Sequence, residues 1–186
     1  MKRLIDLNLA FFALFFFALP ILLVALAVRT TSAGPVFYWS KRVGRDNKLF
    51  NMPKFRTMQI NTPALATHLL PNAKQFLTPV GAFLRKSSLD ELPQLWSIIK
   101  GEMSFVGPRP ALFNQDDLIA LRNQYGVDRL VPGLTGWAQV NGRDELPISD
   151  KVKLDMEYMY NQSLLFDLKI IVMTILKVVI SDGVQH

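Results

Sequence analysis

The chain has 186 residues, which suits one domain with a hydrophobic core and is too short for two ordinary domains. It contains no cysteine and only two histidines, His68 and His186. Disulfides, thiol nucleophiles and cysteine–zinc sites are therefore excluded. A Ser-His-Asp site or a metal site with several histidines is nearly excluded as well. The net charge of +6 suits an anionic partner, namely nucleic acid, anionic lipid or a phosphorylated substrate, although a basic surface without a single partner is the alternative.

The N-terminal segment predicts an association with a membrane. Residues 7–28 carry no charge and are almost entirely apolar. As a helix they reach about 33 Å, enough to cross a hydrocarbon core of ~30 Å. A cleaved signal peptide fits poorly, because Asp6 interrupts the basic start, the apolar run is long and no good cleavage site follows.

Two arrangements of this helix are open from the residues alone. Pro20 lies just past the middle of the run, where it removes a backbone donor and kinks a helix. Lys2 and Arg3 precede the run and Arg29 follows it, and such positive flanks tend to stay in the cytoplasm. A re-entrant helix-break-helix over residues 1–30 would keep both positive flanks in the cytoplasm. A plain spanning helix is the alternative, and the apolar run is long enough for it.

Residues 31–186 are expected to form one unit, continuous with the membrane helix. Residues 34–58 predict two short extended runs around a Gly-Arg-Asp-Asn turn, and the second run brings Lys54 and Arg56 to one face if it is a strand. The other expected elements, in chain order, are a proline-rich loop with one helical turn over 60–79, a helical or extended approach over 80–87, a helix from Pro93 to Lys100 closed by Gly101, a helix over 115–125 closed by Gly126, a glycine-rich loop over 131–147 and a helix over 149–161 with Ser149 as its cap.

The last segment predicts a helix with a narrow polar stripe. Asp167, Thr174 and Ser181 fall seven residues apart, with Lys177 beside them, on an otherwise apolar helix. Such a helix suits either the membrane interface or the core, and the interfacial position is preferred.

The adjacent acids Asp90 and Glu91 have two interpretations. Ser88 and Glu91 match a helix capping box, in which the acids only support a first helical turn. Alternatively, the pair is chemical: without cysteine and with so little histidine, carboxylates are the best nucleophile candidates, and they can attack phosphorus. Phosphoryl chemistry also needs cations and an oxygen ligand for magnesium. The candidate cations are Lys54, Arg56, Arg85, Arg109 and Arg143. Arg109 lies between Pro108 and Pro110, which restrict its backbone.

Three motifs resemble the bacterial sugar transferase family, the monotopic phosphoglycosyl transferases. They are "KFRTM", "SSLDELPQLWSIIKGEMSFVGPRP" and "PGLTGWAQVNGR", they occur in the family's order, and the match runs from Lys2 to about Val179. The resemblance implies an α-dominated α+β fold: a monotopic membrane protein with a re-entrant helix over 1–30 and a small cytosolic catalytic domain over 31–186 that carries interfacial amphipathic helices. It also implies transfer of a sugar-1-phosphate from a UDP-sugar to undecaprenyl phosphate, with release of UMP. The place implied is the cytoplasmic face of the bacterial inner membrane, at the first membrane step of a surface glycan pathway, with a homodimer as an option.

The resemblance also assigns roles to residues. Asp90 would be the nucleophile and would lie beside Mg²⁺, and Glu91 would assist as a base or in orienting groups. The residues implied to face phosphates are Arg85, Arg109 and Arg143, and those implied for the substrate-binding loops are Pro108, Pro110, Gln139 and Asn141. Two positions depart from the pattern: Leu19-Pro20 replaces a Ser-Pro pair, and Val131 stands where many relatives carry a basic residue.

Competing functions explain fewer of these features. A non-catalytic, membrane-anchored basic module for anionic lipid or partner enzymes explains the charge and the anchor, and leaves the acids to capping. A two-pass subunit, with spans at 7–28 and 164–180, would place Asp167, Lys169 and Lys177 at bilayer depth, which is costly. Nucleic-acid binding is not expected, since no basic helix or aromatic platform is present.

Overall fold

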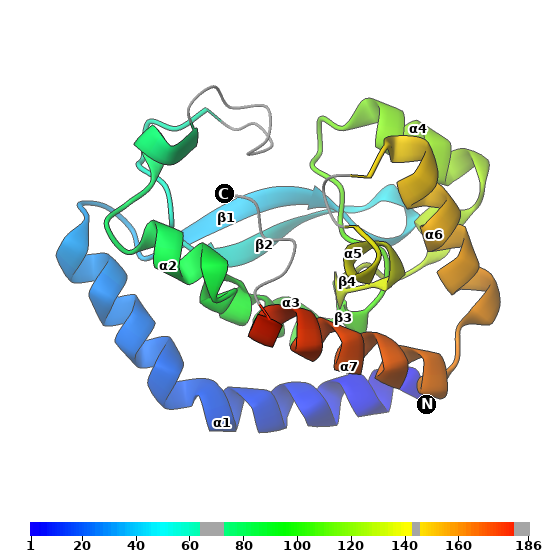
Figure 1. Cartoon of the computed structure of the whole chain (residues 1–186), viewed down its shortest axis with the longest axis horizontal. Helices are drawn as coiled ribbons and strands as arrows, with labels where there is room; N and C mark the ends of the chain where they lie inside the picture. Colours follow the sequence, from blue (N-terminus) through cyan, green and yellow to red (C-terminus); the bar gives the residue numbers. More distant parts are fainter. Residues whose placement is uncertain (64–72, 143–145, 181–186) are drawn as a thin grey trace.

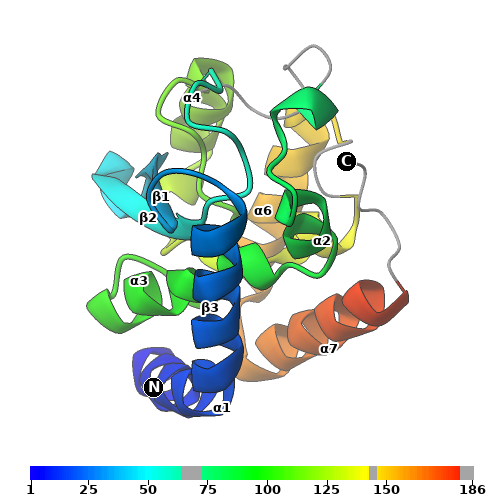
Figure 2. The same cartoon turned by 90° about the vertical axis from the view of Figure 1, so that its left-hand side faces the viewer.

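The computed structural model describes residues 1–63, 73–142 and 146–180 of the chain. Helices dominate this part, and two small β-sheets complete an α+β fold, as expected. The long N-terminal and C-terminal helices lie together at one end of the molecule, and α4, Asp116–Gln124, lies at the opposite end (Figures 1 and 2).

Helix α1, Lys2–Thr31, contains the apolar run and is mostly exposed. By length and composition it could cross a membrane. Pro20 lies inside the helix, so the expected interruption at Leu19-Pro20 is not a gap in helical structure. Figure 1 shows instead that α1 bends, with one arm along the base of the molecule and the other rising beside it. A bend is the ordinary effect of a proline that removes one hydrogen bond from the ladder.

Both ends of α1 are bonded to the rest of the chain. At its start, the Arg3 guanidinium donates to the carbonyls of Ile98 and Ile99, the latter at 2.7 Å. At its end, Arg56 donates to the Ser32 carbonyl at 3.0 Å and to the Pro35 carbonyl at 2.8 Å. The helix is therefore tied to one folded unit at both termini.

The two predicted extended runs form the antiparallel pair β1, Phe37–Val43, and β2, Leu49–Phe55. The turn between them is η1, Arg45–Asn47, where Asp46 and Asn47 have positive φ. Asn and Asp tolerate this conformation better than other side chains do.

The helix that was expected from Pro93 to Lys100 is built differently from the prediction. Helix α2, Gly81–Lys86, follows η3, Ala73–Phe76; the chain then forms the 3-10 helix η4, Leu89–Gln94, which runs directly into α3, Leu95–Lys100. The predicted start at Pro93 therefore falls inside η4. The predicted end is confirmed, because Gly101 follows Lys100 with a φ of +85°.

The glycine-rich segment was expected to be a loop, and it is more regular than that. It contains β4, Gly133–Thr135, which pairs in parallel with β3, Ser104–Val106, and then the short helix α5, Trp137–Val140. The glycines permit this pairing, since a Cβ on Gly133 would lie 2.1 Å from the Gly107 nitrogen. The local glycine and proline pattern predicts a loop, but residues 133–135 form a strand because they pair with β3, which is distant in the sequence.

Helices α4 and α6 pack against each other. Helix α4, Asp116–Gln124, ends before Gly126, which has a φ of +72°, as predicted, and η5, Val127–Arg129, follows. Helix α6, Ile148–Asn161, begins after Pro147, so Ser149 lies inside its first turn and is not the cap.

Helix α7, Leu164–Ile180, turns its polar stripe inward. Asp167 is buried and accepts a 2.7 Å hydrogen bond from the Tyr158 hydroxyl, and it also pairs with Lys2. The Thr174 hydroxyl lies 2.7 Å from that of Thr135; Ser181 falls outside the described residues. The exposed face of α7 is apolar and includes Leu165, Leu168, Val172, Ile175 and Leu176.

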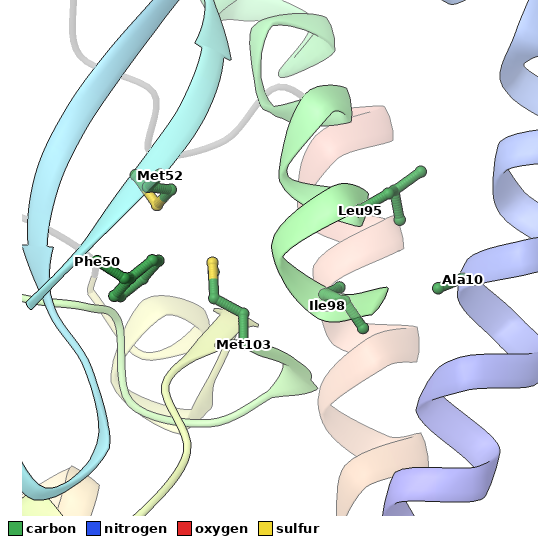
Figure 3. Close-up of a cluster of buried hydrophobic side chains, with 6 residues drawn as sticks. All are labelled: Ala10, Phe50, Met52, Leu95, Ile98 and Met103. Carbon is green, nitrogen blue, oxygen red and sulfur yellow. The ribbon is translucent and has the colours of Figure 1, made fainter. Parts of the chain in front are cut away.

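The core joins the membrane helix to the residues around the acidic pair. Figure 3 shows one cluster that draws on α1, β2, α3 and the segment after α3, and its members are Ala10, Phe50, Met52, Leu95, Ile98 and Met103. This packing holds η4 and α3 between α1 and β2, which fixes the position of Asp90 and Glu91.

Candidate active site

Asp90 and Glu91 lie in the first turn of η4 and do not form a capping box. Ser88 has a positive φ of +55°, and its side chain makes no capping hydrogen bond. The Glu91 amide donates instead to the Ser88 carbonyl at 3.2 Å, which is an ordinary backbone turn. Asp90 is buried, with 7% of its surface exposed. Capping therefore does not explain the pair.

Lys54 at the end of β2 contacts both acids. Its Nζ donates to the Glu91 Oε1 at 2.7 Å and lies 3.9 Å from the Asp90 Oδ2. All three side chains are largely buried. Because solvent screens such a group only weakly, the Lys54 charge acts strongly on both carboxylates.

Arg109 approaches Glu91 from the Gly-Pro-Arg-Pro segment after β3. Its Nη2 lies 3.3 Å from the same Glu91 Oε1 that Lys54 binds, and its side chain is 37% exposed. A half-exposed guanidinium beside two carboxylates can bind further anionic oxygen. The structure thus brings together Asp90, Glu91, Lys54 and Arg109, which come from three separate segments.

The two carboxylates have opposite electrostatic environments. Burial raises the pKa of Asp90 to about 6, with Glu91 adding to the rise and Lys54, Arg85 and Arg109 opposing it. Burial also raises the pKa of Glu91, but attraction by Lys54 and Arg109 and the hydrogen bonds from both outweigh burial and hold that pKa below its usual range. Glu91 is therefore the permanently ionised partner, and Asp90 titrates closer to neutral pH.

Arg85 adds a further positive charge at this site. Its Nε donates to the Thr57 hydroxyl at 3.0 Å, and its charge lowers the pKa of Asp90. Burial lowers the pKa of Arg85 itself, and Asp90 opposes that shift. Sequence reasoning missed Thr57, although its place directly after Arg56 in the "KFRTM" motif was a usable signal.

Arg56 has a structural environment rather than an open one. It is buried, and its guanidinium donates to the carbonyls of Ser32, Ala33 and Pro35 and to the Ser32 hydroxyl. Strand β2 includes Lys54 but ends at Phe55. Arg56 therefore lies outside the strand, and the two cations do not share a strand face as expected. The geometry favours a role for Arg56 in holding the end of α1.

Four further predicted site residues lie around β3, β4 and α5. The Pro108 carbonyl accepts from the Gly133 amide at 2.9 Å, and the Pro110 carbonyl accepts from Arg42 Nη1 at 3.0 Å. The side-chain Nδ2 of Asn141 donates to the Trp137 carbonyl at 2.8 Å, so Asn141 closes α5. Gln139 is buried, and neither polar atom of its side chain has a partner within the described part of the chain. Arg143 lies outside the described residues.

The described residues thus combine an apolar helix long enough to cross a membrane, a small α+β domain and a buried carboxylate pair among cations. The chain belongs to the bacterial sugar transferase family, whose model matches residues 1–181. It is a transferase of that family, and the predicted resemblance is confirmed.

Individual relatives support the same family. The chain is 41% identical to the uncharacterized sugar transferase EpsL of Bacillus subtilis, over 100% of this chain and 91% of that protein. It is 39% identical to the UDP-glucose:undecaprenyl-phosphate glucose-1-phosphate transferase of Escherichia coli, over 95% of this chain and 40% of that protein. It is 38% identical to the undecaprenyl-phosphate galactose phosphotransferase of Salmonella typhimurium, over 83% of this chain and 35% of that protein. The chain thus spans nearly all of the first relative and well under half of the other two.

Proposed function

We propose that this protein transfers a sugar-1-phosphate from a UDP-sugar to undecaprenyl phosphate and releases UMP, as the first membrane step of a surface glycan pathway. The observation that carries the proposal is the cluster of Asp90, Glu91, Lys54 and Arg109, in which a buried acid of raised pKa lies among cations. Perturbed acids with specific charged partners are typical of functional sites. The names of the relatives from E. coli and S. typhimurium support the same reaction class.

The proposed reaction proceeds in two displacements at one phosphorus. A carboxylate oxygen of Asp90 attacks the β-phosphorus of the UDP-sugar, a P–O bond forms to Asp90, and the bond to the bridging oxygen breaks so that UMP leaves with that oxygen. A phosphate oxygen of undecaprenyl phosphate then attacks the same phosphorus and releases the Asp90 carboxylate. The products are UMP and the lipid diphosphate sugar, and no water is consumed. Such covalent catalysis replaces one difficult transfer by two easier ones.

The surrounding residues suit these steps. Glu91 is held ionised by Lys54 and Arg109, so it is suited to orient these two cations toward the substrate. Arg109 and Arg85 supply positive charge where the diphosphate would develop negative charge. Lys54 contacts both acids, and its positive charge reduces the electrostatic repulsion between the two carboxylates.

Magnesium is the proposed cofactor. The described residues contain no group of three or more histidine or acidic side chains that could hold a metal ion by itself. Magnesium, however, is commonly bound through one or two carboxylates together with substrate phosphates, so the pair Asp90 and Glu91 fits this ion. Asp90 would hold it, and the bound ion would neutralise charge on the diphosphate.

The protein is proposed to be monotopic, on the cytoplasmic face of the bacterial inner membrane. Both ends of α1 are bonded to one folded unit, through Arg3 at the start and Arg56 at the end. A helix that crossed the bilayer would place its ends on opposite sides, whereas a bent helix that enters one leaflet keeps them together. The apolar outer face of α7 lies at the same end of the molecule and suits the interface (Figure 1).

One experiment tests the chemistry directly. The purified protein is incubated with Mg²⁺ and a panel of UDP-sugars, including UDP-glucose and UDP-galactose, without a lipid acceptor, and its intact mass is measured. We expect a phosphosugar adduct and stoichiometric UMP, both absent from Asp90→Asn. With undecaprenyl phosphate present, Glu91→Gln should lose activity on the order of a hundredfold, because it holds Lys54 and Arg109 less well and misplaced groups cost about that much.

The non-catalytic binding module makes the opposite prediction. It expects no adduct, no UMP release and no difference between wild type and Asp90→Asn in either assay. Turnover by Asp90→Asn at the wild-type rate would overturn Asp90 as the nucleophile.

A further inference from the structure

A buried ion pair lies behind the candidate site. Arg122 of α4 donates from Nε and Nη2 to the Oδ2 of Asp155 in α6, at 3.0 and 2.7 Å. The side chains are only 10% and 2% exposed. Burying two charges is expensive, and their attraction often only balances the cost. A pair in this position therefore calls for a role beyond joining two helices.

The remaining guanidinium nitrogen of Arg122, Nη1, indicates what that role is. Its Nη1 donates to the backbone carbonyl of Arg109 at 2.8 Å, so one guanidinium bonds both Asp155 and the Gly-Pro-Arg-Pro segment. On the next residue, Arg42 Nη1 donates to the Pro110 carbonyl at 3.0 Å. Two successive carbonyls of the segment are thus held by side-chain donors from different elements.

The composition of the Gly-Pro-Arg-Pro segment explains why side chains, and not backbone amides, bond these two carbonyls. Pro108 and Pro110 have no backbone N–H, so the segment offers few donors of its own for a regular ladder. Its carbonyls remain strong acceptors that need partners when buried. An arginine can satisfy one of them and still keep two nitrogens on a carboxylate, because its donors form a rigid fork.

From this geometry we infer that Arg122, oriented by Asp155, is a positioning residue that fixes Arg109 for the reaction. The chain of contacts runs from Asp155 through Arg122 to the Arg109 carbonyl, and from the Arg109 guanidinium to Glu91 at 3.3 Å. In this proposal Arg122 acts through Arg109 and not on the substrate directly. The inference rests on the proposed function, in which Arg109 acts on the diphosphate of the UDP-sugar.

The first test separates folding from positioning. Arg122→Lys keeps a positive charge beside Asp155 but loses the fork that reaches the Arg109 carbonyl. We expect a melting temperature close to wild type and a kcat/KM for UMP release lowered about tenfold to a hundredfold, the range of one hydrogen bond to a charged group. Asp150→Asn is the matched control on α6, because it removes an exposed acid whose ion-pair partner among the described residues is Lys153; it should leave both quantities unchanged.

A second variant guards against misfolding. The double substitution Arg122→Met with Asp155→Leu removes both buried charges and replaces them by apolar groups of similar volume, a change that proteins often tolerate. We expect a folded protein with the same loss of kcat/KM as Arg122→Lys. Wild-type activity in the folded double variant would overturn the inference.

A double-mutant cycle tests whether Arg122 acts through Arg109. In an Arg109→Ala background, Arg122→Lys should cause no further loss of kcat/KM, because the group that it positions is gone. Losses that multiply would mean that Arg122 acts independently of Arg109, and the inference would fail.

Hydrogen exchange of the peptide 107–113 tests the positioning without any turnover. It should be faster in Arg122→Lys than in wild type and unchanged in Asp150→Asn; equal exchange in all three would show that Arg122 does not hold the segment. This result stands apart from the proposed function: a wild-type protein that released no UMP from any UDP-sugar would refute the reaction, and the exchange data would still decide whether Arg122 fixes the segment.

Discussion

At the scale of single residues, Asp90 combines burial with a need for charge. A carboxylate must be ionised to attack phosphorus, yet burial favours the protonated form and raises the pKa of Asp90 to about 6. The residue is therefore expected to cost folding free energy whenever it is ionised. Active sites commonly carry such a cost for the sake of activity.

The sign of this cost follows from the two pKa values. In the unfolded chain the Asp90 carboxyl has its ordinary pKa of 3.8, so as the pH rises from 3.8 to 6 the unfolded state loses its proton first and is increasingly favoured. Above pH 6 the full penalty is present, and below pH 3.8 it vanishes. The difference between the two pKa values corresponds to roughly 3 kcal/mol.

Asp90→Asn should therefore stabilise the protein while abolishing its activity. At pH 8, with EDTA present, we expect the free energy of unfolding to rise by roughly 3 kcal/mol, and the gain should disappear as the pH falls below about 4. Urea unfolding in detergent solution at several pH values measures this. Asp150→Asn, which removes an exposed acid, is the control and should show almost no change. A loss of stability at pH 8 would contradict the prediction.

Sequence reasoning recovered part of this site at the residue scale. Asp90, Glu91, Lys54 and Arg109 were predicted, and the structure brings them together. Arg122 and Asp155 were missed because each lies alone within a helical sequence. A usable signal was that Arg122 lies four residues after buried Leu118, on the apolar face of α4.

At the scale of elements, the close pairing of β3 with β4 positions the Gly-Pro-Arg-Pro segment. A Cβ on Gly133 would lie 2.1 Å from the Gly107 nitrogen, and a Cβ on Gly107 would lie 2.3 Å from the Val131 carbonyl oxygen. Backbone atoms cannot move aside as a flexible side chain can. Glycine is therefore required here for close approach and not for turning the chain.

Gly133→Ala should separate the two strands. We expect a loss of about 3 kcal/mol in the free energy of unfolding, at the upper end of overpacking costs, together with a large loss of activity. Gly126→Ala is the comparison: nothing lies within 4 Å of its Cβ position, so only the strain of a φ of +72° remains, about 1–2 kcal/mol. Urea unfolding of both variants measures the difference, and an equal or smaller cost at Gly133 would show that the strands adjust.

Helix α7 shows why the direction of an amphipathic face needs the tertiary structure. Its polar stripe meets internal partners: Asp167 binds Tyr158, and Thr174 contacts Thr135. Ile170 packs into the core, whereas another set of apolar residues, which includes Leu165 and Leu168, is left outside. A soluble domain would bury the apolar face, so this reversed arrangement supports contact with lipid.

At the scale of the whole molecule, the two tied ends of α1 predict its topology. A single cysteine is introduced either after Met1 or as Thr31→Cys, in a chain that otherwise has none. In spheroplasts, a membrane-impermeant maleimide added outside should label neither site, and both should react after lysis. Labelling of one site from outside would mean that α1 crosses the bilayer, and the monotopic arrangement would be abandoned.

The sequence by itself determined the features that depend on local composition. An uncharged run of 22 residues makes a helix long and apolar enough to cross a membrane, proline bends it, and Gly101 and Gly126 end helices wherever those helices pack. For the adjacent acids Asp90 and Glu91, by contrast, the residues alone left two interpretations open, helix capping and phosphate chemistry.

Only the tertiary structure decided which partner each polar side chain meets. Arg56 and Arg109 are both plausible phosphate ligands in the sequence, yet Arg56 is bonded to the end of α1 and Arg109 lies beside Glu91. The same holds for Arg122, whose two partners come from α6 and from the segment after β3. The physical reason is that hydrogen bonds and ion pairs act over a few ångströms, and those neighbours come from distant parts of the chain that only packing brings together.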